Sequence, residues 1–367
     1  MKYYIIAGEK SGDQHAANLI TALKQQDAEA EFRGWGGEAM QAAGTDLVQH
    51  YSEMAFMGIW EVVKHLGKIR RFLNRCKQDI IAYQPDVVIL VDYAGFNLRI
   101  AKFAKKQGFK VFYYISPKIW AWNQGRAKTI RQIVDKMFVI LPFEKEFYRN
   151  YDYEVDYVGN PVYDMVKAFK PQANFKKKYF LPDKPIIAVL PGSRKQEVLS
   201  LLEPFLSITH LFQDYQFVIA GVSTLPKEVY AEAQHHEVMV VFDETYDLLY
   251  HAKAAIVASG TASLETALFK VPQVVCYKVS PVTYWIGKMV VKAKYMALPN
   301  LIMGKKIVPE LLQKDFNTNT LIEELQLVLH KNRLSIAADY RELEEKLKRP
   351  SVANYTASLM WKYLNEK

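Results

Sequence analysis

Asp86-Val87-Val88-Ile89-Leu90-Val91-Asp92 is the stretch that decides the fold. Five consecutive apolar residues between two aspartates are typical of a parallel strand that is buried on both faces. Similar runs lie at 3–7, 110–115 and 136–141, with helical stretches at 14–25, 69–82 and 97–108. This alternation predicts a parallel, doubly wound α/β sheet.

The same alternation occurs a second time. It stops at the connector 160–185 and resumes with predicted strands at 186–190, 216–220, 238–242, 254–258 and 273–277. We therefore expect an α/β fold of two Rossmann-like domains, 1–165 and 183–335, that face a cleft. A helical segment, 336–367, follows them.

Composition narrows the class of protein. The 367 residues include 48 basic and 39 acidic side chains, which gives a formal net charge of +9. No apolar run is long enough for a membrane span, the first residues do not read as a signal peptide, and two cysteines cannot staple a secreted scaffold. We expect a cytoplasmic globular protein whose basic surplus meets nucleic acid, an anionic membrane or a phosphorylated substrate.

A carboxylate stands at the end of the opening stretch. Asp92 is followed by Tyr93-Ala94-Gly95-Phe96-Asn97. Ligands of open α/β sheets bind at the carboxyl ends of strands, where a buried carboxylate can act as a general base. A helix cap or a structural ion pair would use the same residue, so the pattern leaves these roles open.

Glycine-containing turns follow predicted strands in both domains. Such turns let backbone N–H groups approach a phosphate, although an ordinary helix cap has the same composition. Leu190-Pro191-Gly192-Ser193-Arg194 and Ser259-Gly260-Thr261 fall in one domain, and the planar charge of Arg194 suits a diphosphate. With Glu265 one turn further on as an acceptor for ribose hydroxyls, they predict a nucleotide site.

The first turn, Gly8-Glu9-Lys10-Ser11-Gly12-Asp13, is neither a P-loop nor a dinucleotide fingerprint. His15 lies one turn into the next helix and could reach a ligand there. No group of histidines shows metal-ligand spacing.

Basic and apolar residues gather at 56–77. Residues 64–77 carry six lysines or arginines and no acid, and Phe56, Met57 and Trp60 precede them. A basic amphipathic helix of this kind is typical of a membrane interface, but also of a helix packed on its own sheet with a solvated basic back.

Several short motifs, taken together, resemble the lipid-A-disaccharide synthase family, whose members are glycosyltransferases of the two-domain GT-B fold. The resemblance covers nearly the whole chain. It rests on Gly8–Asp13, Phe56-Met57-Gly58, Ser116-Pro117-Lys118-Ile119-Trp120-Ala121-Trp122, Leu141-Pro142-Phe143-Glu144-Lys145, Leu190–Arg194 with Glu197-Val198, Ser259-Gly260-Thr261-Ala262 with Glu265, and Leu298-Pro299-Asn300-Leu301.

The resemblance implies an inverting reaction that needs no cofactor or metal. UDP-2,3-diacylglucosamine would condense with 2,3-diacylglucosamine 1-phosphate (lipid X) to give the β-1,6-linked lipid A disaccharide 1-phosphate and UDP. Asp92 would deprotonate the acceptor hydroxyl. The UDP-binding residues would be Gly192, Ser193, Arg194, Ser259, Gly260, Thr261, Glu265 and Asn300. Acceptor or sugar contacts would come from Glu9, Ser11, Gly12, His15 and Arg126.

The resemblance also implies that the enzyme is peripherally associated with the inner membrane of a Gram-negative bacterium. The docking residues would be Phe56, Met57, Trp60, Lys64, Lys68, Arg70 and Arg71. The helices of 336–367 would pack back on the N-terminal domain, as in other GT-B proteins. Monomer and dimer both stay open.

The chain departs from the family pattern after the catalytic strand. The family usually reads Asp-x-Pro-Asp-Phe-Asn there, whereas Ala94 and Gly95 stand in place of the Pro and the second Asp. Asp92 would therefore act without a second carboxylate. Two alternatives stay open: another GT-B enzyme that acts on UDP-GlcNAc-type donors, and a non-catalytic protein that binds anionic lipid.

Overall fold

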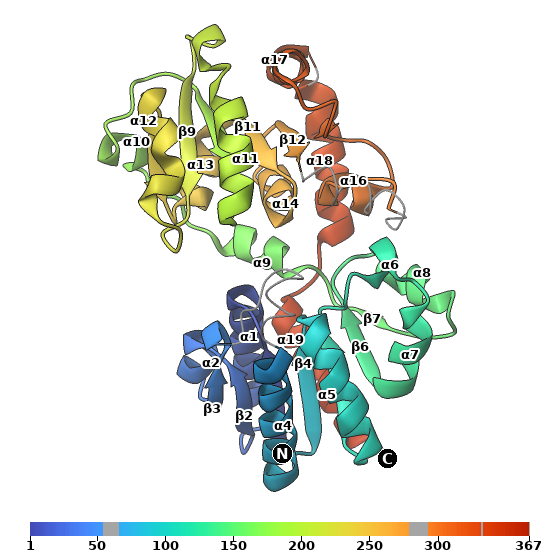
Figure 1. Ribbon diagram of the computed structural model, residues 1–367. Coiled ribbons are helices and arrows are strands. Elements are labelled where there is room, and N and C mark those ends of the chain that lie inside the picture. The colour runs from blue at the N-terminus through green and yellow to red at the C-terminus, as the bar shows by residue number, and fades with distance from the viewer. Residues whose placement is uncertain (54–65, 279–292, 332, 367) are drawn as a thin grey trace. The chain divides into compact units, whose positions relative to one another are not determined.

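The computed structural model describes residues 1–53, 66–278, 293–331 and 333–366. The chain forms two compact units, Met1–Pro161 with Arg349–Lys367, and Val162–Lys348 (Figure 1). Each unit is built around one parallel sheet, which confirms the predicted fold class. The terminal segment 336–367 divides at Arg349, so its first part belongs to the second unit and its last part to the first.

The sheet of the first unit has seven strands in the order β3-β2-β1-β4-β5-β6-β7, and neighbouring strands pair in parallel. The order reverses between β1 and β4, so their carboxyl ends flank a topological switch point. The strands are β1 (Lys2–Ala7), β2 (Glu31–Gly36), β3 (Asp46–His50), β4 (Val87–Val91), β5 (Lys110–Tyr114), β6 (Lys136–Val139) and β7 (Asp156–Tyr157).

Helices cover both faces of this sheet because alternate strand residues point to opposite sides. Tyr4 and Val88 face one core with α4, α5 and α7, whereas Tyr3 and Val87 face the other with α1 and α19. The helices are α1 (Lys10–Gln26), α2 (Glu38–Ala42), α4 (Leu66–Tyr83), α5 (Ala94–Lys106), α6 (Ile119–Trp122), α7 (Arg126–Ile133), α8 (Glu144–Arg149) and α19 (Val352–Asn365), with a 3-10 turn at Tyr51–Glu53.

The sheet of the second unit has six parallel strands in the order β10-β9-β8-β11-β12-β13. Here the order reverses between β8 and β11, and the two predicted nucleotide-binding turns follow these strands. The strands are β8 (Ile186–Leu190), β9 (Gln216–Gly221), β10 (Met239–Phe242), β11 (Ala252–Ala258), β12 (Gln273–Tyr277) and β13 (Glu310–Leu312).

The helices of the second unit anchor its core and its C-terminal side. Leu248 and Leu249 of α13 pack on β8 and β11, and Lys270 donates to the Tyr340 carbonyl of α18 at 2.9 Å. The helices are α9 (Pro161–Ala168), α10 (Phe175–Lys178), α11 (Lys195–Leu206), α12 (Ala231–His235), α13 (Thr245–His251), α14 (Thr261–Leu268), α16 (Leu298–Met303), α17 (Thr318–Gln326) and α18 (Arg333–Leu347), with 3-10 turns at Thr209–Leu211 and Lys227–Tyr230 and a π-helical turn at Leu327–Lys331.

Candidate active site

Asp92 lies directly after β4, at the switch point of the first sheet. Its backbone and that of Tyr93 are left-handed, with φ of 46° and 45°. The Asn97 side chain donates to the Asp92 carbonyl at 2.9 Å, and the Tyr113 hydroxyl donates to the same oxygen. Left-handed backbone is strained for residues other than glycine and persists where surrounding bonds hold it, as these do.

The charges around Asp92 act on its carboxyl in opposite directions. Burial raises the pKa of this carboxyl, the positive charge of Lys118 lowers it, and the negative charge of Glu9 raises it further. A carboxylate with a raised pKa accepts a proton more readily than an exposed one. The geometry and the charges thus suit the predicted base.

Only part of the first glycine-containing turn, residues 8–13, is exposed. Helix α1 begins at Lys10, with Glu9 as its extended N-cap. Glu9 and Ser11 are exposed, but Gly12 is buried in the helix, where a Cβ would lie 3.5 Å from the Ala7 Cβ. Glu9 and Ser11 could therefore reach a ligand, whereas Gly12 is buried, and the space there would also admit a Cβ.

His15 is half-buried on α1. Burial lowers the pKa of its imidazole to about 4. The ring is therefore neutral at physiological pH and can offer a hydrogen bond but no positive charge.

Two motifs that are far apart in the sequence meet at Glu144. This buried carboxylate accepts hydrogen bonds from Ser116 Oγ at 2.5 Å, Trp120 Nε1 at 3.2 Å and the Leu141 amide at 2.9 Å. It thereby ties the loop after β5 to the loop after β6. Both motifs are recognisable in the sequence, but their contact through Glu144 is not. The acidic residue directly after Leu141-Pro142-Phe143 was the one indication of it.

Arg126 begins α7, shortly after α6 and the loop that follows β5. Its guanidinium lies 5.7 Å from the ring centre of Trp122, and both side chains are exposed. A planar cation held over an exposed ring leaves its N–H groups available to an anionic group.

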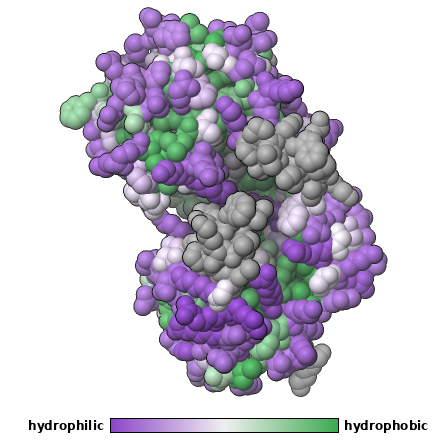
Figure 2. Space-filling view, viewed as in Figure 1, coloured by the Kyte–Doolittle hydropathy of each residue, from purple (hydrophilic) through white to green (hydrophobic). Residues whose placement is uncertain are grey.

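The basic segment 56–77 is described only in part. Phe56, Met57, Trp60 and Lys64 lie outside the described residues. On α4, Arg70 and Arg71 are exposed, Lys68 is half-buried, and Phe72 packs into the core. Figure 2 shows a strongly hydrophilic surface over α4. The described part of the helix thus packs on its own sheet and exposes a basic surface to solvent.

The turn after β8 in the second unit already holds a carboxylate. Gly192 has φ of 110°, and Arg194 is the exposed N-cap of α11. Glu197 Oε2 accepts from the amides of Ser193 at 3.2 Å and Arg194 at 3.3 Å, and its Oε1 lies 3.4 Å from Arg194 Nη1. A bound anion such as a phosphate would use the same amide and guanidinium donors that Glu197 uses here.

The turn after β11 is open. Gly260 has φ of 154°, and a Cβ there would meet nothing within 4 Å. Thr261 is exposed at the start of α14, and Ser259 Oγ donates to the Met296 carbonyl at 3.2 Å. The turn therefore offers an unobstructed helix start that is tied to the loop before α16.

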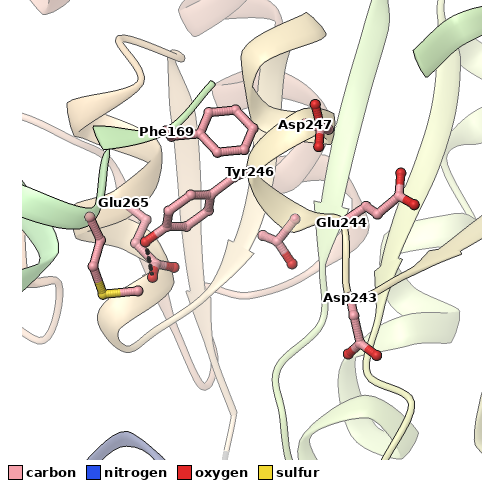
Figure 3. Close-up of a pocket in the computed structure, with 8 residues that line it drawn as sticks. Phe169, Asp243, Glu244, Tyr246, Asp247 and Glu265 are labelled. Carbon is pink, nitrogen blue, oxygen red and sulfur yellow. Dashed lines mark hydrogen bonds between the residues drawn. The ribbon is translucent and has the colours of Figure 1, made fainter. Parts of the chain in front are cut away.

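Glu265 lines a pocket of about 390 Å³ in the second unit (Figure 3). Burial raises the pKa of its carboxyl, and a hydrogen bond from the Tyr246 hydroxyl lowers it. The lining residues are Met165, Phe169, Asp243, Glu244, Thr245, Tyr246, Asp247 and Glu265. Sequence reasoning found only Glu265, because the others come from the connector, from the turn between β10 and α13, and from α13 itself, which carry no recognisable motif.

Asn300 is buried, with both ends of its amide engaged. Its Oδ1 accepts from the amides of Ile307 at 2.7 Å and Val308 at 2.9 Å, and its Nδ2 donates to Val308 O at 2.9 Å and to Glu310 Oε1 at 2.6 Å. Glu310 in turn accepts from the amides of Met296 and Ala297. Asn300 thus fixes the loop around α16, and a direct contact with a donor stays a prediction.

Two classes of feature are absent from the part of the chain that the structure describes. No group of three or more His, Cys, Asp or Glu side chains could hold a metal ion among residues 1–53, 66–278, 293–331 and 333–366. Within the same residues, no helix is long and apolar enough to cross a membrane.

Comparisons with known proteins agree over nearly the whole chain. Residues 3–362 match the family model described as lipid-A-disaccharide synthetase. The chain is 39% identical over 364 residues to the lipid-A-disaccharide synthase of Syntrophus aciditrophicus, covering 96% of this chain and 95% of that one. It is 35% identical over 363 residues to that of Coxiella burnetii, covering 97% and 96%.

Solved structures with a similar fold are more distant in sequence. The UDP-GlcNAc 2-epimerase of Neisseria meningitidis bound to UDP-GlcNAc matches with a TM-score of 0.65 and 13% identity, covering 99% of each chain. The calicheamicin glycosyltransferase CalG4 matches with a TM-score of 0.65 and 14% identity, covering 99% and 98%. At these identities the likeness concerns the fold alone.

Proposed function

Since this chain belongs to the lipid-A-disaccharide synthase family, we propose which of its residues carry out the reaction of that family. The protein is a glycosyltransferase that condenses lipid A precursors. It transfers the sugar of UDP-2,3-diacylglucosamine to 2,3-diacylglucosamine 1-phosphate, which gives the β-1,6 disaccharide 1-phosphate and UDP.

The observation that carries the mechanism is the placement of Asp92. The carboxylate follows a buried strand at a switch point, and burial raises its pKa. We assign it as the general base. As the acceptor 6-oxygen bonds to C1 of the donor sugar, its proton passes to Asp92, and the bond from C1 to the UDP oxygen breaks with its electron pair on UDP. Attack opposite the leaving group inverts the configuration at C1.

The second unit supplies the donor site in this proposal. Arg194 and the turns Gly192-Ser193 and Ser259-Gly260-Thr261 follow neighbouring strands, so they can surround one diphosphate. Their N–H groups, the start of α14 and the Arg194 charge stabilise the negative charge that develops on departing UDP. Glu265 accepts hydrogen bonds from the ribose hydroxyls, and Asn300 keeps the loop around α16 in place.

The acceptor contacts are proposed for the first unit. Glu9 and Ser11 are exposed beside the loop that carries Asp92, and Arg126 presents its guanidinium over Trp122. Arg126 suits the 1-phosphate of the acceptor, because a planar guanidinium pairs well with phosphate. His15 contributes only as a neutral hydrogen-bonding group, and Gly12 is buried in the first turn of α1.

We also propose peripheral association with the inner membrane, where both acylated substrates reside. The exposed cations of α4 support it, since each cation near an anionic surface contributes roughly 1 kcal/mol. Arg70→Glu with Arg71→Glu should weaken sedimentation with vesicles of anionic phospholipid at low salt. Lys227→Glu with Lys253→Glu, two exposed sites of the second unit, should change it less. Unchanged partitioning of the α4 variant would overturn the proposal.

The test of the reaction uses the acylated donor, the acceptor and a chelator. Wild-type protein should release UDP and form the disaccharide, detected by mass spectrometry. Asp92→Asn should lower turnover about 10²–10⁴-fold and keep its affinity for UDP. Asp86→Asn is a matched control, since Asp86 accepts the Lys2 amide at the opposite end of β4. Equal activity on non-acylated UDP-GlcNAc would favour another GT-B reaction, and normal turnover by Asp92→Asn would remove the proposed base.

A further inference from the structure

Tyr246 and Glu265 meet in the pocket of the second unit (Figure 3). The Tyr246 hydroxyl, at the start of α13, donates to Oε1 of Glu265 on α14 at 3.0 Å. We propose that Tyr246 is a positioning residue that holds the Glu265 carboxylate ready for the ribose hydroxyls and so makes the site distinguish ribose from deoxyribose. The inference rests on the nucleotide site proposed above.

The Tyr246 ring is fixed by two other rings. Phe169 crosses it nearly at a right angle, with ring centres 5.5 Å apart and planes at 87°. Phe269 lies 5.1 Å away at 66°, and the two phenylalanines contact each other at 5.6 Å. Tilted and edge-to-face pairs at such distances are favourable arrangements of aromatic rings. The hydroxyl therefore has a defined position before any ligand arrives, and little side-chain freedom is lost on binding.

The bond also determines what the Glu265 carboxyl can do. A tyrosine that donates to Oε1 favours the ionised carboxylate, which counteracts the effect of burial on this group. An ionised carboxylate is purely an acceptor, and a ribose diol offers two hydroxyl donors. Because the hydrogen bond from Tyr246 orients Oε1, the whole carboxylate has a fixed orientation, and its remaining lone pairs are available to the ribose.

The other carboxylates of the pocket are engaged elsewhere. Asp247 accepts from the Gln172 amide at 2.6 Å and from its side chain at 3.1 Å. Glu244 pairs with Lys178, and Asp243 accepts from the Ser223 amide at 3.2 Å. Glu265 is thus the acid of this pocket whose orientation depends on Tyr246, and it is the one that we assign to the ribose.

The experiment compares UDP with 2′-deoxy-UDP and 3′-deoxy-UDP by isothermal titration calorimetry. Wild-type protein should bind at least one deoxy analogue about 10-fold more weakly than UDP, as expected for a lost hydrogen bond to a charged acceptor. Tyr246→Phe keeps the ring packing and removes the hydroxyl. It should weaken the binding of UDP but not that of the deoxy analogue, so the ratio of the two affinities should be no more than about 3-fold. A merely structural defect would weaken all three ligands alike.

Two further variants complete the test. Tyr250→Phe removes an exposed hydroxyl one turn along α13 and should leave the ratio at its wild-type value. Glu265→Gln should narrow the ratio, and adding Tyr246→Phe to it should cause little further loss, because the two residues act as one unit. A ratio that Tyr246→Phe leaves unchanged overturns the inference while UDP binding stands. Failure of the wild-type protein to bind any of the three overturns the nucleotide site itself.

Discussion

The ring of Tyr93 lies directly against the α carbon of Gly8. A Cβ at Gly8 would come within 2.2 Å of the Tyr93 Cδ1 and 2.3 Å of its Cγ. Since no such contact is possible, the glycine is required by the ring, and the ring belongs to the residue after Asp92. The end of β1 and the end of β4 are thus packed together where the proposed base stands.

Gly8→Ala should therefore change the position of Asp92, although the new methyl group contacts Tyr93. The methyl group must push the Tyr93 ring away, and that shift reaches the left-handed backbone of Asp92. We expect a loss of about 1–3 kcal/mol in stability from overpacking, and a fall in kcat that exceeds any change in UDP affinity. Steady-state kinetics and denaturant unfolding measure the two effects.

Gly95→Ala provides the matched control. Gly95 lies in the first turn of α5, close in sequence to Asp92, and a Cβ there would meet nothing within 4 Å. Alanine is a better helix residue than glycine by roughly 0.5–1 kcal/mol, so this variant should keep its activity and be no less stable. Equal kinetics for Gly8→Ala and Gly95→Ala would contradict the proposed coupling.

The charges beside Asp92 predict opposite shifts of the pH profile. Asp92 must be deprotonated to accept the acceptor proton, so kcat/KM should fall as pH drops through the pKa of its carboxyl, which burial raises. Lys118 lowers this pKa and Glu9 raises it. Lys118→Met should move the acidic limb to higher pH and Glu9→Gln should move it to lower pH. Both shifts should be small, because Lys118 and Glu9 are exposed and water screens their charges.

The control for this pair is Glu29→Gln, an exposed glutamate in the turn before β2. It removes one negative charge from the same unit and should leave the acidic limb in place. Shifts of Lys118→Met and Glu9→Gln in the same direction would show that the limb reports another group.

The raised pKa of Glu144 predicts that the free energy of unfolding depends on pH. Burial raises the pKa of its carboxyl from 4.5 to about 7. Between these values the folded protein holds a proton that the unfolded chain has lost, so this group stabilises the fold fully below about pH 4.5 and its contribution is lost as pH rises through about 7. The free energy of unfolding of the wild-type protein, relative to that of Glu144→Gln, should therefore rise by about 2 kcal/mol from pH 7.5 to pH 5.

Denaturant unfolding at the two pH values measures this difference. Glu146→Gln replaces an exposed glutamate on the same helix, so its difference from the wild-type protein should stay constant between pH 7.5 and pH 5. A constant difference for Glu144→Gln as well would mean that Glu144 does not titrate in this range.

Much of the fold could be predicted because buried parallel strands are written as continuous apolar runs. The run at 86–92 is β4, and the run at 186–190 is β8. The end of the chain could not be divided by the same reasoning. Residues 336–365 read as one helical segment, but α18 ends at Leu347 and α19 begins at Val352, after Pro350. Which unit each helix joins depends on contacts such as those of Ala357 and Met360 with the core around α1, and periodicity does not specify a partner.

The candidate site could be located from the sequence where polar residues follow a strand, as with Asp92 after β4, Arg194 after β8 and Glu265 in the helix after β11, and the roles of these residues stay predictions. It was not predictable where a side chain acts on another side chain that is far away in the sequence. Tyr246 approaches Glu265 across 19 residues, and Glu144 approaches Ser116 across 28. Neither spacing has a recognisable pattern, because the tertiary packing of separate elements creates the contact: α13 on α14 in the first case, and α8 on the loop after β5 in the second.

Asn300 shows how a motif residue can act through its loop. Asn300→Asp would keep the acceptor for the Ile307 and Val308 amides, but would lose the donor to Glu310 Oε1 and place a buried carboxylate against the half-buried one of Glu310. We expect a loss of about 3–5 kcal/mol in the free energy of unfolding, because the substitution buries a charge that has lost its hydrogen-bonding partner. UDP affinity should fall with it, since Met296 of this loop accepts from Ser259.

Asn317→Asp is the matched control for this last prediction. Asn317 caps α17 by accepting the Thr320 amide at 3.1 Å, and aspartate caps helices as well as asparagine does. Asn317 also donates to the Lys314 carbonyl at 3.3 Å, but that site is exposed and water can replace the bond. This variant should therefore stay within about 0.5 kcal/mol of the wild-type protein, and a large difference between the two Asn→Asp changes would show the effect of burial at Asn300. If Asn300→Asp were equally harmless in denaturant unfolding and UDP titration, the loop around α16 would not depend on the bond between Asn300 and Glu310.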